Sequence, residues 1–250
     1  MNAGEEEQFP VLKRTFKGQT DSITGIGFSS NLKQIATSSY DNTVFVWNFK
    51  SNLRPLKLLG HKGPVYDLSV NPTGQLIASA SSDHSVRIWN NNSEAGYYLM
   101  KAHSGPVRGV DFSCDGQLLL TCSDDKSLKV WTVLDHKFHF SITSHSNWVR
   151  SCQFSADSRY IVSGSDDRTV RVFDTESSGS ELCCFTDHAG MVSCVRFHPD
   201  CQCVASCGSD KKVKIFDTRS KRLLQHYDAH FDGVNSVAFH PSGHYLVSTS

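Results

Sequence analysis

The sequence lacks long hydrophobic runs, an excess of charge of either sign and an export signal. No apolar stretch approaches the roughly 18 residues needed to span a bilayer. The opening residues, MNAGEEEQFP, are acidic and have no apolar segment of the signal-peptide type. The 25 basic residues balance the 25 acidic ones, which gives no overall field for nucleic acid or anionic lipid. We therefore expect no membrane partner and no nucleic-acid partner, and a disordered acidic N-terminus over residues 1–8.

Cysteine is present but follows no structural pattern. There are nine cysteines, an odd number, and no export signal accompanies them. This combination predicts reduced thiols in a cytoplasmic protein. The paired C-x2-C spacing of a zinc site does not occur, so we expect no metal ligands.

Motifs of common enzyme classes are also missing. The sequence contains no G-x-x-x-x-G-K-[ST] phosphate loop, no H-E-x-x-H and no G-x-S-x-G elbow. Gly25-Ile26-Gly27 lacks the third glycine of a dinucleotide fingerprint. We therefore predict that the chain is not an enzyme and has no catalytic residue, no cofactor and no small-molecule substrate.

What the sequence does contain is a repeat. Five histidines lie 42, 42, 43 and 42 residues apart: His61, His103, His145, His188 and His230. Gln19 occupies the position one step of 42 residues before His61. An aspartate marks the same step: Asp41, Asp83, Asp125, Asp167 and Asp210. An aromatic residue follows six residues later: Trp47, Trp89, Trp131, Phe173 and Phe216. Three markers with one period indicate a repeat architecture.

Each unit reads as short β-strands separated by turns rich in Gly, Pro and Asp, without sustained helical periodicity. Units of about 42 residues with this content predict an all-β fold, a β-propeller built from four-stranded blades. The expected blades are 18–59, 60–101, 102–143, 144–186 and 187–228, with part of a sixth at 229–250. Residues 9–17 are expected to form the outer strand of the closing blade, so that the propeller domain covers 9–250. Seven blades would need roughly 60 further residues, which predicts a fragment or a natural short isoform.

These residues resemble the WD-repeat family along essentially the whole chain. The resemblance implies a structural tetrad in each blade, in which histidine bridges the turn aspartate and a strand hydroxyl that also meets an indole N–H. The implied members are His61, Ser79, Asp83 and Trp89; His103, Thr121, Asp125 and Trp131; His145, Ser163 and Asp167; His188, Ser206 and Asp210. Phe173 and Phe216 lack the indole N–H. Because these Ser–His–Asp sets recur with the repeat, we interpret them as scaffold rather than as catalytic triads.

The resemblance also implies a partner-binding rim. Its positions are the third and fifth residues after the histidine and the residue before the turn aspartate. Trp148 is out of register with the apolar positions Val149, Cys152 and Phe154, which predicts a surface location. The rim residues of the types enriched in interface hot spots are Tyr40, Tyr66, Arg108, Trp148, Arg150 and Met191. The alternative is that Arg108 and Arg150 only neutralise the neighbouring Asp124 and Asp166.

Four stretches resemble centriolar WD-repeat proteins of the proteome-of-centriole (Poc) type. They are LKRTFKG, HSNWVRSCQFSADSRYIVSGSDDRTVRVFD, DKKVKIFDTRSKRLLQHY and VNSVAFHPSGHYLVSTS. The resemblance implies a non-catalytic scaffold that supports centriole integrity and cilium assembly. It further implies centriolar protein partners, with tubulin in the microtubule wall as a candidate. The implied location is the cytoplasm and cytoskeleton, at the centrosome, centriole and basal body of the cilium.

Two other functions fit a WD-repeat protein. KIFDTR, Lys214 to Arg219, resembles the box by which some family members dock on the adaptor of a cullin-type ubiquitin ligase, with Arg219 as the contact. This predicts, as an alternative, a substrate receptor of such a ligase or another adaptor. A role like that of G-protein β is a third option, although no helical N-terminal segment is evident for a γ partner.

Overall fold

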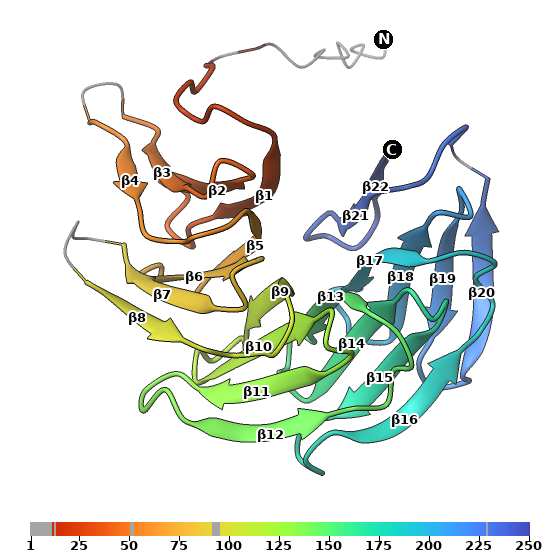
Figure 1. Ribbon diagram of the computed structural model, residues 1–250. Coiled ribbons are helices and arrows are strands. Elements are labelled where there is room, and N and C mark those ends of the chain that lie inside the picture. The colour runs from red at the N-terminus through yellow and green to blue at the C-terminus, as the bar shows by residue number, and fades with distance from the viewer. Residues whose placement is uncertain (1–11, 13, 51–52, 92–95, 229) are drawn as a thin grey trace, which may run out of the picture.

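The strands form an open arc of blades. The computed structural model describes residues 12, 14–50, 53–91, 96–228 and 230–250. Within these residues the chain has no helix and forms five four-stranded antiparallel sheets and one two-stranded sheet. The sheets stand side by side around a central axis, and a gap separates the first sheet from the two-stranded one (Figure 1). The prediction of an all-β propeller with five complete blades and part of a sixth is confirmed.

Each sheet uses consecutive strands, with the first innermost. The strands of the first two blades are β1 (Ile23–Phe28), β2 (Gln34–Ser39), β3 (Val44–Asn48) and β4 (Leu56–Leu58), then β5 (Val65–Val70), β6 (Leu76–Ser81), β7 (Val86–Asn90) and β8 (Tyr97–Met100). The next two blades hold β9 (Val107–Phe112), β10 (Leu118–Ser123), β11 (Leu128–Thr132), β12 (Phe138–Ile142), β13 (Val149–Phe154), β14 (Tyr160–Ser165), β15 (Val170–Asp174) and β16 (Ser180–Phe185). The remaining strands are β17 (Val192–Phe197), β18 (Cys203–Gly208), β19 (Val213–Asp217), β20 (Arg222–Tyr227), β21 (Ser236–Phe239) and β22 (Leu246–Thr249).

The turn aspartates explain why the second and third strands of each blade reverse so tightly. Asp83 Oδ1 accepts hydrogen bonds from the backbone N–H of Ser85 at 3.0 Å and from its hydroxyl at 2.5 Å. The intervening His84 has a φ of 67°, a left-handed conformation that costs a non-glycine residue roughly 1 kcal/mol or more. The hydrogen bonds that Asp83 accepts from Ser85 offset this cost. The same conformation recurs at Asn42, Lys126, Arg168 and Lys211.

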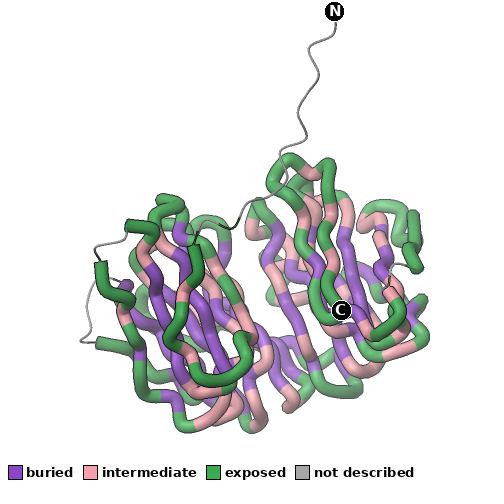
Figure 2. The backbone as a smooth tube through the Cα atoms, turned by 90° about the horizontal axis from the view of Figure 1, so that it is seen from above, coloured by how far each residue is buried: buried purple, intermediate pink, exposed green. Residues whose placement is uncertain are grey.

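Hydrophobic cores lie between neighbouring sheets. One core joins Val86 and Met100 of the second blade to Val107 and Leu119 of the third, and similar clusters join each following pair of blades. A sheet therefore needs a neighbour on both faces to be fully covered. The first blade lacks that cover on its gap side, where Ile23, Ile26 and Phe28 of β1 are 61%, 62% and 59% exposed. Viewed from above, buried segments concentrate inside the sheets while exposed segments form the turns (Figure 2).

The predicted outer strand at 9–17 is not formed in the described part of that range. Residues 9–11 and 13 lie outside the described residues, as does the expected disordered segment 1–8, and Leu12 and residues 14–17 are not in a strand. Phe16 instead packs on Trp47, with ring centroids 5.3 Å apart, and Arg14 Nη1 donates to the Phe49 carbonyl at 2.8 Å. A strand needs a neighbouring edge to pair with, and in the described residues this segment has the side chains of the first blade beside it instead.

Side chains on the innermost strands tie adjacent blades together. Asp111 Oδ2 accepts the N–H of Phe154 at 2.9 Å, and Gln153 Oε1 accepts the N–H of Phe197 at 2.8 Å. Asp67 Oδ2 accepts the N–H of Val110 at 3.2 Å in the same way. Burial raises the pKa of Asp67 to about 7 and that of Asp111 to about 6, even though the positive charge of Arg196 lowers both. The three hydrogen bonds between blades fix the spacing of the blades around the central axis.

Candidate functional site

The tetrads form continuous hydrogen-bond chains inside the blades. In the second blade, His61 Nδ1 lies 3.0 Å from Asp83 Oδ2, and its Nε2 lies 2.7 Å from Ser79 Oγ. Trp89 Nε1 donates to the same hydroxyl at 2.8 Å. The equivalent distances to aspartate and hydroxyl are 2.9 and 2.8 Å at His103, 2.8 and 2.6 Å at His145, and 2.8 and 2.6 Å at His188. The side-chain polar atoms of each of these four histidines thereby have partners, as burial requires.

Three blades depart from this pattern. In the first blade Gln19 Oε1 accepts from the Thr37 hydroxyl at 2.8 Å, while the backbone N–H of Thr20, rather than a histidine, donates to Asp41 at 2.8 Å. Phe173 and Phe216 fill the indole position of the fourth and fifth blades and are fully buried. They replace one hydrogen bond, worth about 1 kcal/mol net, with apolar packing.

The electrostatics of the tetrads suit a scaffold. Burial raises the pKa of Asp83, Asp125 and Asp167, but hydrogen bonds from the histidine and from the Ser or Thr two residues later outweigh it and hold the pKa well below its ordinary value. Burial lowers the pKa of His103 and His188, so these imidazoles are neutral at pH 7. The strand hydroxyls of Ser79, Thr121, Ser163 and Ser206 are completely buried, which keeps any substrate away from them.

Another contact, which recurs in three blades, was not predicted from the sequence. The basic residue two positions before the aromatic marker donates to a carbonyl just ahead of the histidine. Arg87 Nη2 reaches the Gly60 carbonyl at 2.6 Å, and Lys129 Nζ reaches the Ala102 carbonyl at 2.8 Å. Lys214 Nζ makes the equivalent contact with the Asp187 carbonyl. The alternation of basic and apolar residues in VRIW, LKVW and VKIF was the available signal.

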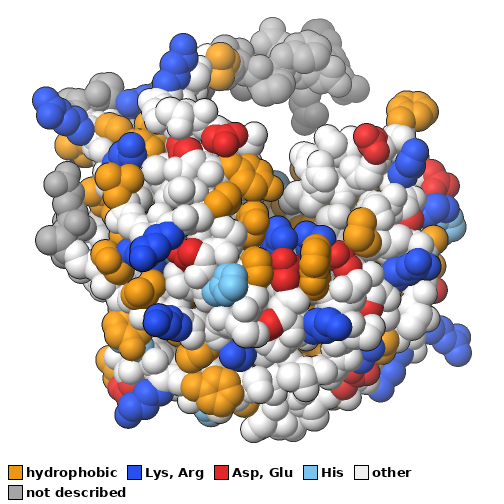
Figure 3. Space-filling model, in the orientation of Figure 1, with side chains coloured by type: hydrophobic (Ala, Val, Ile, Leu, Met, Phe, Trp, Pro, Cys, Tyr) orange, Lys and Arg blue, Asp and Glu red, His pale blue; other side chains and the backbone are white. Residues whose placement is uncertain are grey.

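The candidate site is a cavity of about 630 Å³ at the mouth of the central channel. The fifth residue after the histidine, or after Gln19 in the first unit, contributes to its lining in all six units: Thr24, Tyr66, Arg108, Arg150, Ser193 and Asn235. Ile23, Tyr40, Asp166 and Met191 complete the lining. The hollow at the centre of the ring brings basic, acidic and apolar side chains together (Figure 3). One repeat slot thus supplies most of the surface, and we call this cavity the channel mouth.

A β-bulge aims that slot at the channel mouth. In each complete blade the register between the first and second strands shifts across this residue, as between Val149 and Ser151, which flank Arg150. The same shift flanks Thr24, Tyr66, Arg108 and Ser193. A bulge leaves one residue unpaired and turns its side chain away from the sheet. The slot that lines the channel mouth is therefore built into the backbone of every complete blade.

Five of the six predicted rim residues form one connected set. Tyr40 and Tyr66 meet edge to face with ring centroids 5.9 Å apart, and the Arg108 guanidinium lies 4.2 Å from the Tyr66 ring centroid. Trp148 lies between two guanidiniums, 5.1 Å from that of Arg150 and 6.0 Å from that of Arg108. We call these five residues the rim ladder. Cation–π contacts at these distances hold the rings and guanidiniums in a fixed arrangement.

The two arginines also pair with aspartates, as the alternative interpretation expects. Arg108 donates through Nε and Nη2 to Asp124, and Arg150 donates through the same atoms to Asp166, at 2.7 Å for each Nη2. Burial lowers the pKa of Arg108, but the hydrogen bonds that it donates to Asp124 and the negative charge of Asp124 outweigh burial and raise this pKa. Neutralisation and participation in the rim are therefore compatible.

Trp148 and Met191 are exposed, by 42% and 46% respectively. Met191 lines the channel mouth, whereas Trp148 belongs to the rim ladder without lining the cavity. Of the six predicted rim residues, five thus line one cavity, and the sixth contacts both of its arginines.

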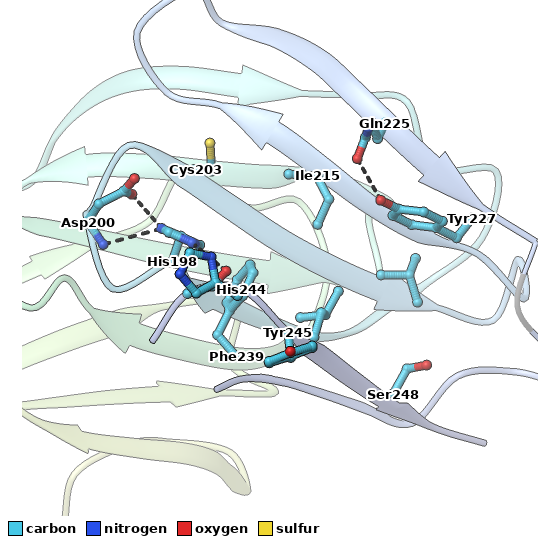
Figure 4. Close-up of a pocket in the computed structure, with 13 residues that line it drawn as sticks. His198, Asp200, Cys203, Ile215, Gln225, Tyr227, Phe239, His244, Tyr245 and Ser248 are labelled. Carbon is cyan, nitrogen blue, oxygen red and sulfur yellow. Dashed lines mark hydrogen bonds and ion pairs between the residues drawn. The ribbon is translucent and has the colours of Figure 1, made fainter. Parts of the chain in front are cut away.

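A second cavity, of about 620 Å³, lies between the fifth blade and the two-stranded sheet (Figure 4). Its lining includes Ile215 of β19, Tyr227 of β20 and Phe239 of β21. Here β21 and β22 cover only part of the fifth sheet, which leaves Tyr227 46% exposed. His198 approaches Asp200 at 2.7 Å, but no group of three or more metal-ligating side chains occurs in the described part of the chain. We interpret this cavity as an incompletely covered sheet face.

Arg219 is exposed, and its N–H donates to Asp217 Oδ1 at 2.8 Å. It follows the end of β19, whereas the channel mouth lies at the start of the innermost strands. Because β19 and the innermost β17 run in the same direction, Arg219 lies on the face opposite to the mouth. The ubiquitin-ligase alternative stays a prediction. No helix in the described residues is long and apolar enough to cross a membrane.

Comparisons with known proteins agree with this architecture. The family model described as WD domain, G-beta repeat (WD40) matches residues 10–48, 53–90, 97–132, 136–174, 179–217 and 221–250. From the second match on, each match contains the outer strand of one blade and then strands of the next, so sequence repeats and blades are offset by one strand. Each of these sequence repeats therefore spans two neighbouring blades. Its first strand is hydrogen-bonded in one sheet, and its other strands belong to the next sheet.

Shorter stretches resemble individual proteins. The chain is 46% identical over 52 residues to POC1 centriolar protein homolog A of Xenopus laevis, covering 21% of this chain and 12% of that protein. It is 46% identical over 54 residues to POC1 centriolar protein homolog B of Mus musculus, covering 22% and 11%. It is 39% identical over 71 residues to Target of rapamycin complex subunit wat1 of Schizosaccharomyces pombe, covering 28% and 22%. The matched stretches thus span between about a tenth and a fifth of these relatives.

Proposed function

Because the chain belongs to the WD40-repeat family, we propose that it is a non-catalytic interaction scaffold that acts at centrioles and basal bodies. The observation that carries the proposal is the convergence of one repeat slot from all six units on the channel mouth. Repeated bulges with aromatic, basic and polar side chains provide a surface for partners. The buried tetrads hold the blades that position this surface.

The centriolar assignment is supported by the POC1 relatives, whose names place them at the centriole. The proposed partners are centriolar proteins, and the proposed function is support of centriole integrity and cilium assembly. Tubulin of the microtubule wall is one candidate, because its acidic surface would complement Arg108 and Arg150. The wat1 match supports the broader statement that related propellers work as subunits of protein complexes.

The test is imaging of a fluorescently tagged form in ciliated cells, beside Trp148→Ala and Leu134→Ala variants. Leu134 is 92% exposed and lies in the turn between β11 and β12, at the opposite end of the blade from the mouth. We expect the parent protein and Leu134→Ala to mark centrioles, and Trp148→Ala to lose at least half of that signal while melting at the same temperature. A parent protein spread evenly through the cytoplasm would contradict the centriolar function. Full retention by Trp148→Ala would contradict the role of the rim.

A further inference from the structure

The channel mouth has hydrogen-bond donors without acceptors. Arg108 and Arg150 each use Nε and Nη2 for their aspartate, and in neither does Nη1 donate to a described residue. The hydroxyls of Tyr40, Tyr66 and Ser193 also have no hydrogen-bond partner among the described residues. All five side chains line the same cavity. Asp166, the carboxylate in that lining, already directs both oxygens at Arg150.

Tyr66 and Trp148, two of the three aromatic rings of the rim ladder, already have a guanidinium beside them. Arg108 lies over Tyr66 and Arg150 lies beside Trp148, at 4.2 and 5.1 Å from the ring centroids. A partner's lysine or arginine would have to displace a guanidinium that is also paired with a buried aspartate. The side chains of Asp124 and Asp166 are only 7% and 6% exposed, so breaking these pairs would leave a buried charge uncompensated. The mouth is therefore unsuited to a cationic group.

We propose that the channel mouth binds the carboxylate of a glutamate or aspartate side chain within an acidic polypeptide segment. Two guanidinium Nη1 groups and the phenol hydroxyls would donate to its oxygens, and Met191 would contact its aliphatic part. This inference rests on the proposed function, and it specifies the chemistry of the partner.

A single negative charge fits the mouth better than a doubly charged phosphate. The charges of Arg108 and Arg150 are balanced by Asp124 and Asp166, so the mouth offers oriented donors but little net positive charge. Charge-assisted hydrogen bonds stabilise one carboxylate in such a setting. A phosphate or a nucleic-acid backbone would give up more hydration without a compensating net charge. The mouth is also a single depression whose two arginines are both paired with aspartates, rather than a basic stripe that could follow a polymer.

The test measures binding of fluorescein-labelled peptides by anisotropy at 150 mM salt. One peptide carries six glutamates between glycine–serine flanks, and matched peptides carry glutamines or phosphoserines. We expect the glutamate peptide to bind at least tenfold more tightly than the glutamine peptide. Equal binding of these two peptides would overturn the proposal. A phosphoserine peptide that binds tenfold more tightly than the glutamate peptide would identify a phosphate site and also overturn it.

Variants locate the binding to the mouth. The double variant Arg150→Gln/Asp166→Asn removes the pair without changing net charge or leaving a buried charge unpaired, and we expect about tenfold weaker binding. Tyr66→Phe removes one hydroxyl and keeps the ring, so it should weaken binding about threefold with an unchanged melting temperature. The control Asp135→Asn/Lys137→Gln removes an exposed ion pair at the opposite end of the blade and should bind as the parent does. Equal losses in the control and the mouth variants would show non-specific attraction and refute the site.

This experiment and the imaging test fail in different ways. If the glutamate peptide does not bind but Trp148→Ala still loses its centriolar signal, the scaffold function is supported and the carboxylate site is refuted. If the glutamate peptide binds but the parent protein does not mark centrioles, the carboxylate site is supported and the proposed location is refuted.

Discussion

Each turn aspartate stabilises a blade through both of its carboxylate oxygens. Asp167 Oδ2 accepts from His145 Nδ1 at 2.8 Å and from the Ser146 N–H at 3.1 Å. Its Oδ1 accepts from the N–H and the hydroxyl of Thr169 at 3.0 and 2.6 Å. One side chain therefore closes the turn and orients the imidazole. We therefore expect the stability of the blade to depend on this residue more than on an exposed ion pair.

Asp167→Asn tests that dependence. The amide keeps one acceptor but presents its NH2 to donors, which leaves buried groups without partners. We expect the free energy of unfolding to fall by about 2–4 kcal/mol, measured by urea denaturation. Asp135→Asn, whose exposed side chain pairs with the exposed Lys137, is the matched control and should change it by less than about 0.5 kcal/mol. Similar losses in the two variants would show that the tetrad is not the source of the effect.

The buried carboxyl of Asp67 makes the stability of the folded protein depend on pH. Its pKa is raised to about 7 by burial, with Asp111 adding to the rise and Arg196 and the N–H groups of Leu68 and Val110 opposing it. The folded protein thus binds a proton more tightly than the unfolded chain, so this group's contribution is greatest at low pH and is lost as pH rises toward 7.

Asp67→Asn removes that dependence. Between pH 5 and pH 7.5 the variant should gain about 2 kcal/mol of stability relative to the parent, measured as the difference between their unfolding free energies at each pH. Comparison with the parent cancels the contributions of His103 and His188, whose lowered pKa values make stability fall as pH drops below about 6.5. A difference that is constant over this range, or one of opposite sign, would contradict a raised pKa at Asp67.

At the scale of elements, the innermost strand contributes both to the hydrophobic core and to the lining of the channel mouth. Its second residue forms the bulge in each complete blade, and from the second blade to the fifth the valine before it enters the inter-blade core. In the fourth blade Val149 and Cys152 are buried, whereas Arg150 lines the channel mouth. A bulge thus lets one short strand contribute to the core and to the channel mouth at once.

Substitutions in the fifth blade separate these roles. Ser193 is the bulge residue, and the next residue, Cys194, is only 4% exposed. Ser193→Asp should change the free energy of unfolding by less than about 0.5 kcal/mol. Cys194→Asp should lower it by more than about 3 kcal/mol, because it buries an unpaired charge. Urea denaturation compares the two, and equal costs would mean that the bulge does not redirect the side chain.

The sequence predicted the blades well because its markers are local. The histidine, aspartate and aromatic positions fix where each strand begins, and five complete units followed from their period. The bulge was not predicted, although the apolar positions Val149, Cys152 and Phe154 carried its signal. The step of three residues between the first two, followed by a step of two, is what one extra residue in a strand produces.

Contacts between blades could not be predicted in the same way. Asp67, Asp111 and Gln153 occupy different repeat slots or differ in type, and only the three-dimensional arrangement shows that each accepts an N–H from the next blade. The same limit applied to the rim ladder. Its members were predicted one by one, but the cation–π contacts that connect them depend on the spacing of neighbouring blades.

At the scale of the whole molecule, the arc is unevenly covered. Central blades pack against neighbours on both faces, whereas β1 and the two-stranded sheet each face the gap (Figure 1). The exposed positions Ile26 and Phe28 of β1 contrast with Val110 and Phe112 of β9, which are 3% and 6% exposed. Local stability should therefore decrease from the middle of the arc toward its two ends.

Hydrogen–deuterium exchange followed by mass spectrometry measures this gradient. We expect peptides that contain β1 or β21–β22 to exchange at least tenfold faster than peptides that contain β10 or β14, whose residues are almost entirely buried. Uniform protection across all blades would contradict the expected gradient and indicate that the ends are covered in solution.

The central claim is that the channel mouth is the surface that meets centriolar partners. The most direct measurement replaces single residues with a photo-crosslinking phenylalanine derivative in ciliated cells and identifies the proteins captured. Tyr66 of the second blade lines the mouth, and Tyr160, at the opposite end of the fourth blade, is the control. The account predicts that position 66 captures centriolar proteins and position 160 captures few or none. Capture of the same centriolar proteins from position 160, with none from position 66, would contradict it.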